Sequence, residues 1–174
     1  MNNNFYTGYD ELVITEKFLK NNNRFIVNNI LNKIQLKKNH KILDFGAGIG
    51  TLSDIIYQFT KIRPICAEID QKNKKILRRK KFKVINNIVS SKTNFDLIFS
   101  SNVLEHIEDD IEILKNIRAK LNANGILYLY LPAMQILYSD FDRSIGHFRR
   151  YNKKELISKV QESGLKVQLC EYSD

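Results

Sequence analysis

The sequence predicts an α/β domain in which a mostly parallel sheet is covered by helices on both faces. Three observations predict this class. Short apolar segments typical of strands alternate with segments in which apolar residues recur at helical spacing. A glycine-rich turn, GAGIG at residues 46–50, joins the first such strand to the first such helix. With 174 residues, of which 43% are hydrophobic, the chain has the length of one domain and enough apolar side chains for one core.

Strands are expected where short apolar runs end at glycine, proline or polar residues. The predicted strands are, in chain order, Lys41–Phe45, Arg63–Ile69, Phe82–Asn86, Phe95–Ser100, Ile126–Leu131 and Leu165–Glu171. Pro132 closes the fifth of them, since proline cannot donate a hydrogen bond to a sheet. Because helical segments separate most of these strands, they are expected to pair in parallel.

Helices are expected where apolar residues recur three and four positions apart. The predicted helices are Thr51–Thr60, Gln71–Lys81, Ile107–Leu121 and a helix from Asn152 to about Ser163. Asn124 and Gly125 are expected to end the third helix in a left-handed turn. Asn152 and Glu155 have the spacing of a capping box at the start of the fourth.

An N-terminal helical segment at residues 1–36 is expected to precede the main domain at residues 37–174. Within it, Glu11–Leu36 has the pattern of one or two helices, and Asn21–Asn23 are expected to separate them. No apolar run reaches the roughly 18 residues that a membrane-spanning helix needs. The N-terminus also lacks a signal-peptide pattern, so a cytoplasmic protein is expected.

The formal net charge of +9 suggests an anionic partner such as a nucleic acid. The densest basic run, however, falls on the predicted helix Gln71–Lys81, and no aromatic side chains are interleaved with it to stack on bases. Lys, Asn and Ile are all abundant, as an AT-rich coding sequence produces. Nucleic acid is therefore a disfavoured partner.

The run ILDFGAGIGT at residues 42–51 is the strongest local signal for a bound cofactor. Gly46, Gly48 and Gly50 let the backbone approach a ligand closely, and the next helix offers unpaired amides at its N-terminus. Dehydrogenases use a related G-x-G-x-x-G turn, so the glycines alone do not identify the cofactor. Asp44 would repel a pyrophosphate but would attract the sulfonium and ammonium groups of S-adenosylmethionine.

Glu68 ends the second predicted strand, at the edge of the sheet where cofactors bind in open α/β folds. A carboxylate there can accept two hydrogen bonds from a ribose diol. The alternative is that Glu68 caps the next helix or pairs with a lysine. The position supports a cofactor site without identifying the cofactor.

Two further segments resemble class I S-adenosylmethionine-dependent methyltransferases. Residues 95–110, FDLIFSSNVLEHIEDD, resemble their fourth strand and following loop, and residues 121–133, LNANGILYLYLPA, resemble their fifth strand. The resemblance covers about residues 20–171 in the expected order and implies a Rossmann-like fold with S-adenosylmethionine as cofactor. It also implies a seventh, antiparallel strand between the fifth and sixth. Because the sequence ends at Asp174, either the chain is truncated or its sheet lacks that strand.

The resemblance also assigns the cofactor contacts. The first motif and the ribose-binding acid are matched by Asp44, Gly46, Gly48, Gly50 and Glu68. Asn87 stands where the family usually has an aspartate that contacts the adenine amino group, and its side-chain carbonyl can accept the same bond. Asn102 and His106 match positions at the methionine end of the cofactor.

Residues 137–151, LYSDFDRSIGHFRRY, are similar to the D-R-x-x-G-H-x-R-R-Y signature of a bacterial methyltransferase group often associated with glycosyltransferases. This likeness implies an acceptor that is a sugar, a lipid-linked molecule or another anionic small molecule with an oxygen or nitrogen nucleophile. The fourth strand is followed by SNVL and not by the Asn/Asp-Pro-Pro-aromatic motif of enzymes that methylate nucleobase amines. Such acceptors are therefore disfavoured.

The basic and aromatic residues of this signature are candidates for acceptor binding. Arg143, Arg149 and Arg150 are expected to anchor an anionic group, and Tyr151 to flank the acceptor. The alternatives are that the arginines pair with nearby acids and that Tyr151 packs into the core. Those acids are Asp140, Asp142 and Glu155.

Methyl transfer from a sulfonium is an in-line displacement that requires chiefly proximity and alignment, and no cluster has metal-ligand spacing, so no metal is expected. An oxygen or nitrogen acceptor still benefits from a base. His147 is the first candidate and His106 the second, because histidine titrates near neutral pH and both are expected in loops at the carboxyl edge. Alternatively, His106 orients its own loop after Glu105.

Two other functions stay open. The chain is alternatively a non-catalytic module that binds S-adenosylmethionine or a protein partner. An NAD(P)-dependent oxidoreductase is less favoured, because the residues after Glu68 match a methyltransferase. Turnover distinguishes the first alternative from an enzyme, and titration with the two cofactors distinguishes the second.

Overall fold

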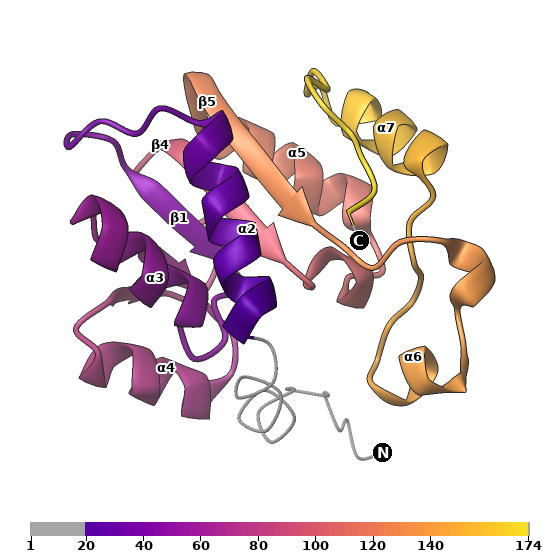
Figure 1. Ribbon diagram of the computed structural model, residues 1–174, viewed down its shortest axis with the longest axis horizontal. Coiled ribbons are helices and arrows are strands. Elements are labelled where there is room, and N and C mark those ends of the chain that lie inside the picture. The colour runs from indigo at the N-terminus through magenta and orange to yellow at the C-terminus, as the bar shows by residue number, and fades with distance from the viewer. Residues whose placement is uncertain (1–19, 174) are drawn as a thin grey trace.

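The computed structural model describes residues 20–173, which form a parallel sheet with helices on both faces (Figure 1). The strands are β1 (Ile42–Phe45), β2 (Ile65–Ala67), β3 (Lys83–Ile85), β4 (Phe95–Ser101) and β5 (Leu121–Tyr130). The helices are α2 (Lys20–Lys33), α3 (Thr51–Thr60), α4 (Gln71–Arg79), α5 (Asp110–Lys120), α6 (Asp140–Ser144) and α7 (Lys153–Glu162), with single 3₁₀ turns η1 (Leu104–His106) and η2 (Gln135–Leu137). The predicted α/β class is confirmed.

The five strands lie in the order β3-β2-β1-β4-β5 and all pair in parallel. Their carboxyl ends therefore meet at one edge of the sheet. The chain runs outward from β1 through β2 and β3, then crosses to the other side of β1 to form β4 and β5. This reversal makes the carboxyl ends of β1 and β4 a topological switch point, where ligands bind in open α/β sheets.

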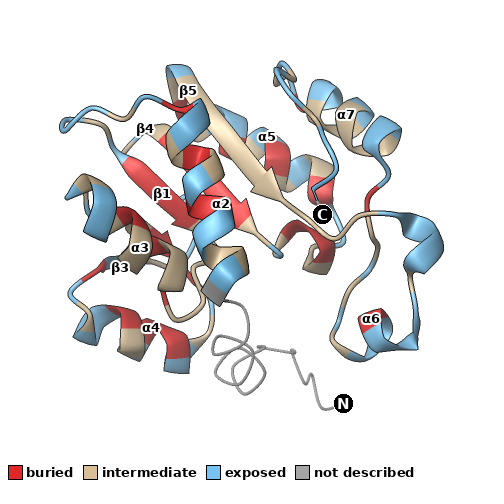
Figure 2. Cartoon of the chain, viewed as in Figure 1, coloured by how far each residue is buried: buried red, intermediate tan, exposed pale blue. Residues whose placement is uncertain are grey.

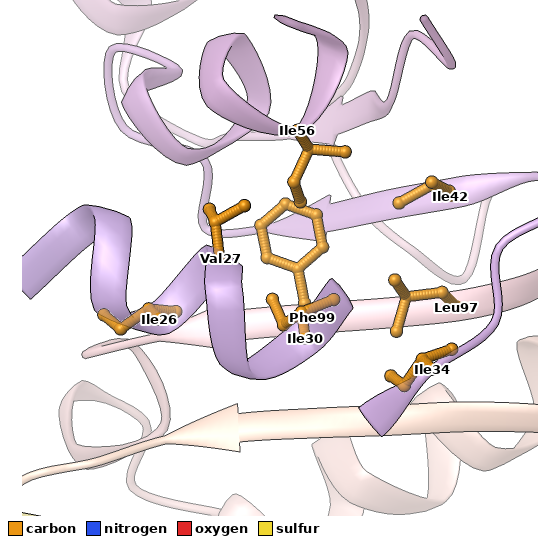
Figure 3. Packing of buried hydrophobic residues seen from close by; sticks show 8 residues of the cluster. All are labelled: Ile26, Val27, Ile30, Ile34, Ile42, Ile56, Leu97 and Phe99. Carbon is orange, nitrogen blue, oxygen red and sulfur yellow. The ribbon is translucent and has the colours of Figure 1, made fainter. Parts of the chain in front are cut away.

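Helices α2, α3 and α4 cover one face of the sheet. The largest buried cluster lies under α2 and α3 (Figure 3) and comprises Ile26, Val27, Ile30, Ile34, Ile42, Ile56, Leu97 and Phe99. Beside it, Leu77 of α4 packs against Cys66 of β2 and Phe82. Burying one such aliphatic side chain contributes about 1.5 to 3 kcal/mol, so these contacts fix α2 to the sheet.

Helices α5 and α7 cover the opposite face. Ile117 of α5 packs on Leu43 and Ile98, while Leu114 lies with Leu104 and Tyr151 in a neighbouring cluster that α7 completes. Figure 2 shows buried residues on β1, on β4 and on the sheet-facing sides of the helices, whereas most of β5 is only partly buried. No helix among residues 20–173 is long and apolar enough to cross a membrane.

The predicted helix break at Asn21–Asn23 is wrong, because α2 runs through all three residues. Asn22 accepts a hydrogen bond from the Tyr130 hydroxyl at 3.2 Å. Its side-chain oxygen is therefore already paired and does not compete for the backbone N–H groups of the helix. Burial of the apolar face of α2 outweighs the weak helix propensity of asparagine. The part of the predicted N-terminal segment before Lys20 lies outside the described residues.

The predicted left-handed turn at Asn124 and Gly125 is also wrong. The α5 helix ends at Lys120 and the backbone continues directly into β5 from Leu121. Gly125 does not have a positive φ; instead, a Cβ there would lie 2.7 Å from the carbonyl oxygen of Phe95. This glycine therefore permits a close approach to β4, beside a shift in the strand register.

The predicted sixth strand at residues 165–171 is not formed in the described chain. An isolated strand has no partner for its backbone groups, and none of the described strands pairs with this segment. Leu165 packs against the cluster under α5, and an ion pair between Glu171 and Lys33 holds the segment to the end of α2. These side-chain contacts replace the expected strand pairing.

Asn152 caps α7 by position, but the predicted capping box is absent. The Asn152 side chain makes no bond to the first turn of α7, and its Oδ1 instead accepts from the backbone N–H of Gln135 at 3.1 Å. Asn152 thus connects the start of α7 to the segment that follows β5.

Candidate cofactor and acceptor site

The glycine turn (residues 46–50) connects β1 to α3 at the carboxyl edge of the sheet. Gly46, Gly48 and Gly50 all have positive φ, a conformation that favours glycine. A Cβ on Gly46 would lie 2.3 Å from a methyl group of Val103, in the loop after β4. Glycine is therefore required for these two loops to approach each other at the switch point.

Glu68 connects the end of β2 to the glycine turn. Its Oε2 accepts a hydrogen bond from Gly48 N at 2.7 Å, and its Oε1 accepts from the backbone amides of Ile69 and Asp70 at 2.7 and 2.8 Å. Burial raises the pKa of Glu68, and the three amide donors only partly offset that effect. Each carboxylate oxygen has more than one lone pair, so further donors such as ribose hydroxyls can be accepted.

Asp44 lies beneath the glycine turn, between β1 and α3. Its side chain is buried, and its Oδ2 accepts from the Ser53 hydroxyl at 2.7 Å. The same hydroxyl lies 3.5 Å from the Cys66 thiol. Burial raises the pKa of Asp44 to about 7, against the opposing effect of the Ser53 hydrogen bond. Asp44 therefore holds the first turn of α3 against the sheet.

The remaining predicted cofactor residues follow the carboxyl ends of β3 and β4. Asn87 is exposed, and its Oδ1 accepts from Val89 N at 2.8 Å. Asn102 is also exposed, has a φ of 52°, and donates its backbone N–H to Tyr130 O at 2.9 Å. All the predicted cofactor residues thus lie at one edge of the sheet.

The chain leaves the sheet after β5 and returns before α7, and we call residues 132–151 the β5–α7 excursion. A parallel bridge between Ala133 and Tyr151 closes it, with Tyr151 N donating to Pro132 O at 2.9 Å. In Figure 1 it extends beyond the arrowhead of β5, on the carboxyl side of the sheet. The excursion therefore lies at the same edge as the glycine turn.

Asp142 organises the interior of this excursion. Its Oδ2 accepts from the backbone N–H and the hydroxyl of Ser139, and its Oδ1 lies 2.9 Å from His147 Nδ1 and 2.8 Å from Arg150 Nε. Burial alone would raise the pKa of Asp142, but the hydrogen bonds from Arg150, Ser139 and His147 hold it well below its usual range. The buried carboxylate therefore fixes both the His147 ring and the Arg150 side chain.

His147 packs against His106 and Glu105 from the β4–α5 connection. The two histidine rings meet edge to face with centroids 4.5 Å apart. His147 Nε2 lies 3.8 Å from Oε1 of Glu105, while His106 Nδ1 lies 3.2 Å from the carbonyl oxygen of Gly146. The structure thus brings both predicted catalytic histidines together.

Glu105 is completely buried, and neither of its carboxylate oxygens has a hydrogen-bond partner. Burial raises its pKa to about 8. Burial also lowers the pKa of His106, and the neighbouring His147 lowers it further. A buried acid without hydrogen-bond partners therefore lies beside two adjacent imidazoles.

The structure places Arg149 and Tyr151 against α5. Arg149 pairs with the buried Asp110 at 2.9 Å and donates to the carbonyl oxygens of Ile107 and Glu108. The Tyr151 hydroxyl lies 2.9 Å from Asp110, and its ring is 2% exposed. Tyr151 thus packs into the core, as the alternative interpretation expected, and Arg149 fixes the excursion to the domain.

The other two arginines differ in exposure. Arg150 is mostly buried and pairs with Asp142 at 2.8 Å. The Arg143 side chain is 70% exposed, and its partner Asp140 is 94% exposed. Among the three predicted acceptor anchors, Arg143 therefore offers its guanidinium most openly to solvent.

Comparisons with known proteins agree with this architecture. A family model described as a methyltransferase domain matches residues 17–169. The chain therefore belongs to the methyltransferase domain family. A comparison with curated proteins gives no match.

Solved structures share the methyltransferase fold at low sequence identity. A chain in the complex between the Haloferax volcanii Trm112 methyltransferase activator and its candidate methyltransferase has a TM-score of 0.75 at 13% identity, covering 91% of this chain and 75% of that one. The YcgJ protein from Bacillus subtilis has a TM-score of 0.67 at 14% identity, with 80% and 68% covered. Phosphoethanolamine N-methyltransferase 2 from Haemonchus contortus, in complex with S-adenosylmethionine, has a TM-score of 0.69 at 15% identity, with 83% and 36% covered.

Sequence reasoning missed two residues of this candidate site. Asp142 was considered only as a salt-bridge partner, although it holds His147 as well as Arg150. Glu105 was considered only as the residue before His106. Its signal was available in the sequence, because an acid beside a histidine immediately after a central strand is placed at the carboxyl edge.

Proposed function

We propose that this chain transfers a methyl group from S-adenosylmethionine to an oxygen or nitrogen nucleophile of a small, anionic and partly apolar acceptor. The observation that carries the proposal is the hydrogen bond between Gly48 N and Glu68 Oε2. It joins a glycine turn to a ribose-binding acid at the switch point, in a chain of the methyltransferase domain family.

The cofactor is S-adenosylmethionine, and the carboxyl edge supplies groups for each part of it. Glu68 accepts hydrogen bonds from the ribose, and Asn87 receives the adenine amino group. The glycine turn and Asn102 contact the methionine portion. Asp44 lies beneath, where its carboxylate attracts the cationic sulfonium and ammonium groups. Asp44 disfavours a pyrophosphate cofactor, since its negative charge would repel the phosphates, whereas a ribose-binding acid such as Glu68 is compatible with either cofactor.

We place the acceptor beside the β5–α7 excursion. Several large apolar side chains are exposed there, namely Met134, Ile136, Leu137, Phe141 and Phe148. Exposed apolar groups concentrated on one segment are typical of a surface that contacts an apolar ligand or membrane. A lipid-linked sugar combines such an apolar part with an anionic group.

Arg143 is the arginine that we assign to the anionic group. Its ion pair with Asp140 is exposed, so exchanging that partner for a phosphate costs little. Arg149 and Arg150 are held by buried carboxylates, and their role is to maintain the shape of the excursion. The acceptor nucleophile attacks the methyl carbon in line with the carbon–sulfur bond, which breaks as the new bond forms and releases S-adenosylhomocysteine. Its proton leaves at the Glu105–His106–His147 cluster.

The test is transfer of radiolabelled methyl from S-adenosylmethionine to lipid-linked sugars and to nucleotide-sugars. The proposal predicts labelled lipid-linked product with the wild-type chain, loss of product with Glu68→Ala, and normal product with Glu162→Ala, which removes an exposed acid on α7. Arg143→Ala should raise the acceptor KM by about tenfold or more, because a charge-assisted contact is lost. Cofactor binding without transfer to either acceptor class would contradict the proposal and favour the non-catalytic module.

A further inference from the structure

We propose that Glu105, His106 and His147 form a binding site for one divalent transition-metal ion. Each residue offers one ligand atom, and these atoms all lie within 4.8 Å of one another. Two imidazole nitrogens and one carboxylate are a ligand set that Zn²⁺ and similar ions prefer. Sequence spacing alone did not indicate this site, because His147 lies 41 positions after His106.

The Glu105 carboxylate is the observation that points to a cation. It is 0% exposed, and both of its oxygens lack hydrogen-bond partners. Buried polar groups are almost always paired, because leaving one unpaired costs free energy. A cation bound between Glu105 and the two rings would satisfy these oxygens.

The neighbouring groups orient both histidines for binding through Nε2. His147 Nδ1 is held by Asp142, and His106 Nδ1 is held by the carbonyl oxygen of Gly146. A hydrogen donated from Nδ1 to an oxygen places the lone pair of the neutral ring on Nε2. Metal-binding histidines are usually oriented in this way by a carboxylate or a carbonyl.

The ligand atoms lie within 4.8 Å of one another, so they would have to move closer together to hold one ion. His147 Nε2 and Glu105 Oε1 are 3.8 Å apart. Zn²⁺ binds nitrogen and oxygen at about 2.0 to 2.2 Å, so two ligand atoms of one ion lie roughly 3.3 Å from each other. The Phe148 backbone N–H donates to Glu105 O at 2.8 Å, which holds the two ligand-bearing segments together.

Three protein ligands leave a coordination position for an exogenous group, as in catalytic zinc sites. Resting on the function proposed above, we assign that position to the acceptor nucleophile. A metal-bound hydroxyl is more acidic, so coordination would favour the attacking form of an oxygen acceptor, whose proton would pass to solvent because the three ligands could no longer accept it. The metal would then serve the acceptor, while the cofactor binds separately at the glycine turn.

The first test uses the full chain labelled with ¹⁵N-histidine and titrated with Zn²⁺. The chain has only three histidines, so each can be followed by NMR. We expect the Nε2 signals of His106 and His147 to shift together and saturate at one equivalent, while His40, which lies before β1, stays unchanged. Absence of shifts for His106 and His147 up to millimolar Zn²⁺ would overturn the proposal without requiring any variant to fold.

The second test compares Zn²⁺ affinity in Glu105→Gln and in His40→Gln by calorimetry. Loss of a metal ligand should weaken binding by about tenfold or more, whereas the His40 variant should match the wild type. Equal affinity in the Glu105 variant would show that Zn²⁺ binds elsewhere. Titration of the same samples with S-adenosylhomocysteine separates the two proposals. Binding of S-adenosylhomocysteine without binding of Zn²⁺ would contradict only the metal site. Binding of Zn²⁺ without binding of S-adenosylhomocysteine would contradict only the proposed function.

Discussion

His147 Nδ1 lies 2.9 Å from Oδ1 of Asp142, a carboxylate that has no solvent exposure. This pair fixes the imidazole inside the β5–α7 excursion and directs its other nitrogen toward Glu105. Because Arg150 binds the same oxygen, one buried acid connects a predicted catalytic residue to a predicted acceptor residue. The order of the acceptor side of the site therefore depends on Asp142.

Asp142→Asn should loosen the excursion. The amide keeps the shape of the side chain but loses the charge that pairs with Arg150, and removing one partner of a buried ion pair costs about 3 kcal/mol or more. We expect lower stability in urea and faster hydrogen exchange within residues 139–150. Asp140→Asn is the matched control, since its side chain is 94% exposed and the change should cost less than about 0.5 kcal/mol. Unchanged exchange in the Asp142 variant would contradict this role.

Arg149→Ala should lower stability, whereas Arg143→Ala should not. Arg149 pairs with the buried Asp110, which also accepts from Lys159, so its loss should cost about 1 to 3 kcal/mol. The exposed pair of Arg143 should contribute less than about 0.5 kcal/mol. Urea denaturation measures both. A stable Arg149→Ala chain with a raised acceptor KM would instead make Arg149 an acceptor anchor.

Asp44→Asn should change the dependence of stability on pH. Burial raises the Asp44 pKa from 3.8 to about 7, so the folded chain holds a proton that the unfolded chain releases near pH 4. The contribution of this group to stability therefore falls as pH rises from about 4 to about 7, by on the order of 4 kcal/mol, and is constant above that range. Urea denaturation of both cofactor-free chains gives their free energies of unfolding at each pH. The wild-type value minus the Asp44→Asn value should fall over this pH range. A flat difference curve would show that Asp44 ionises normally.

Gly48→Val should abolish cofactor binding while leaving most of the fold. Valine at a φ of 54° is strained by about 1 to 3 kcal/mol and adds bulk where the cofactor approaches. Gly164→Val is the control, because it has a φ of 83° and open space around its Cβ, far from the carboxyl edge in sequence and fold. Both variants should lose stability, but only Gly48→Val should lose S-adenosylhomocysteine binding in calorimetry. Equal binding in the two variants would remove the glycine turn from the site.

The parts of the fold that follow local rules could be predicted from the sequence. The strands predicted at Lys41–Phe45 and Phe95–Ser100 and the helix predicted at Thr51–Thr60 needed only periodicity and glycine placement, and the observed bounds lie within one residue of them. The errors arose where distant contacts decide the outcome. Residues 165–171 have the alternation of a strand but lack a pairing partner among the described strands, and α2 tolerates its asparagines because its other face is buried.

The site divides in the same way. The candidate cofactor residues directly follow the ends of strands in the sequence. The parallel topology alone therefore places Gly48 and Glu68 at the same edge of the sheet. The acceptor side depends on a segment that folds back on the β4–α5 connection. Tertiary packing decides which of the three arginines is exposed, and it also brings Glu105 to face His147. Sequence spacing encodes neither result.

Calorimetric titration of the wild-type chain with S-adenosylhomocysteine and with NAD tests whether the carboxyl edge of the sheet binds S-adenosylmethionine. We expect one site for S-adenosylhomocysteine and no heat of binding for NAD, because Asp44 of β1 would repel its pyrophosphate. Glu68→Gln should weaken the interaction by about tenfold or more, since it removes a charge-assisted acceptor for the ribose. Binding of NAD in preference to S-adenosylhomocysteine, or of neither, would contradict the account.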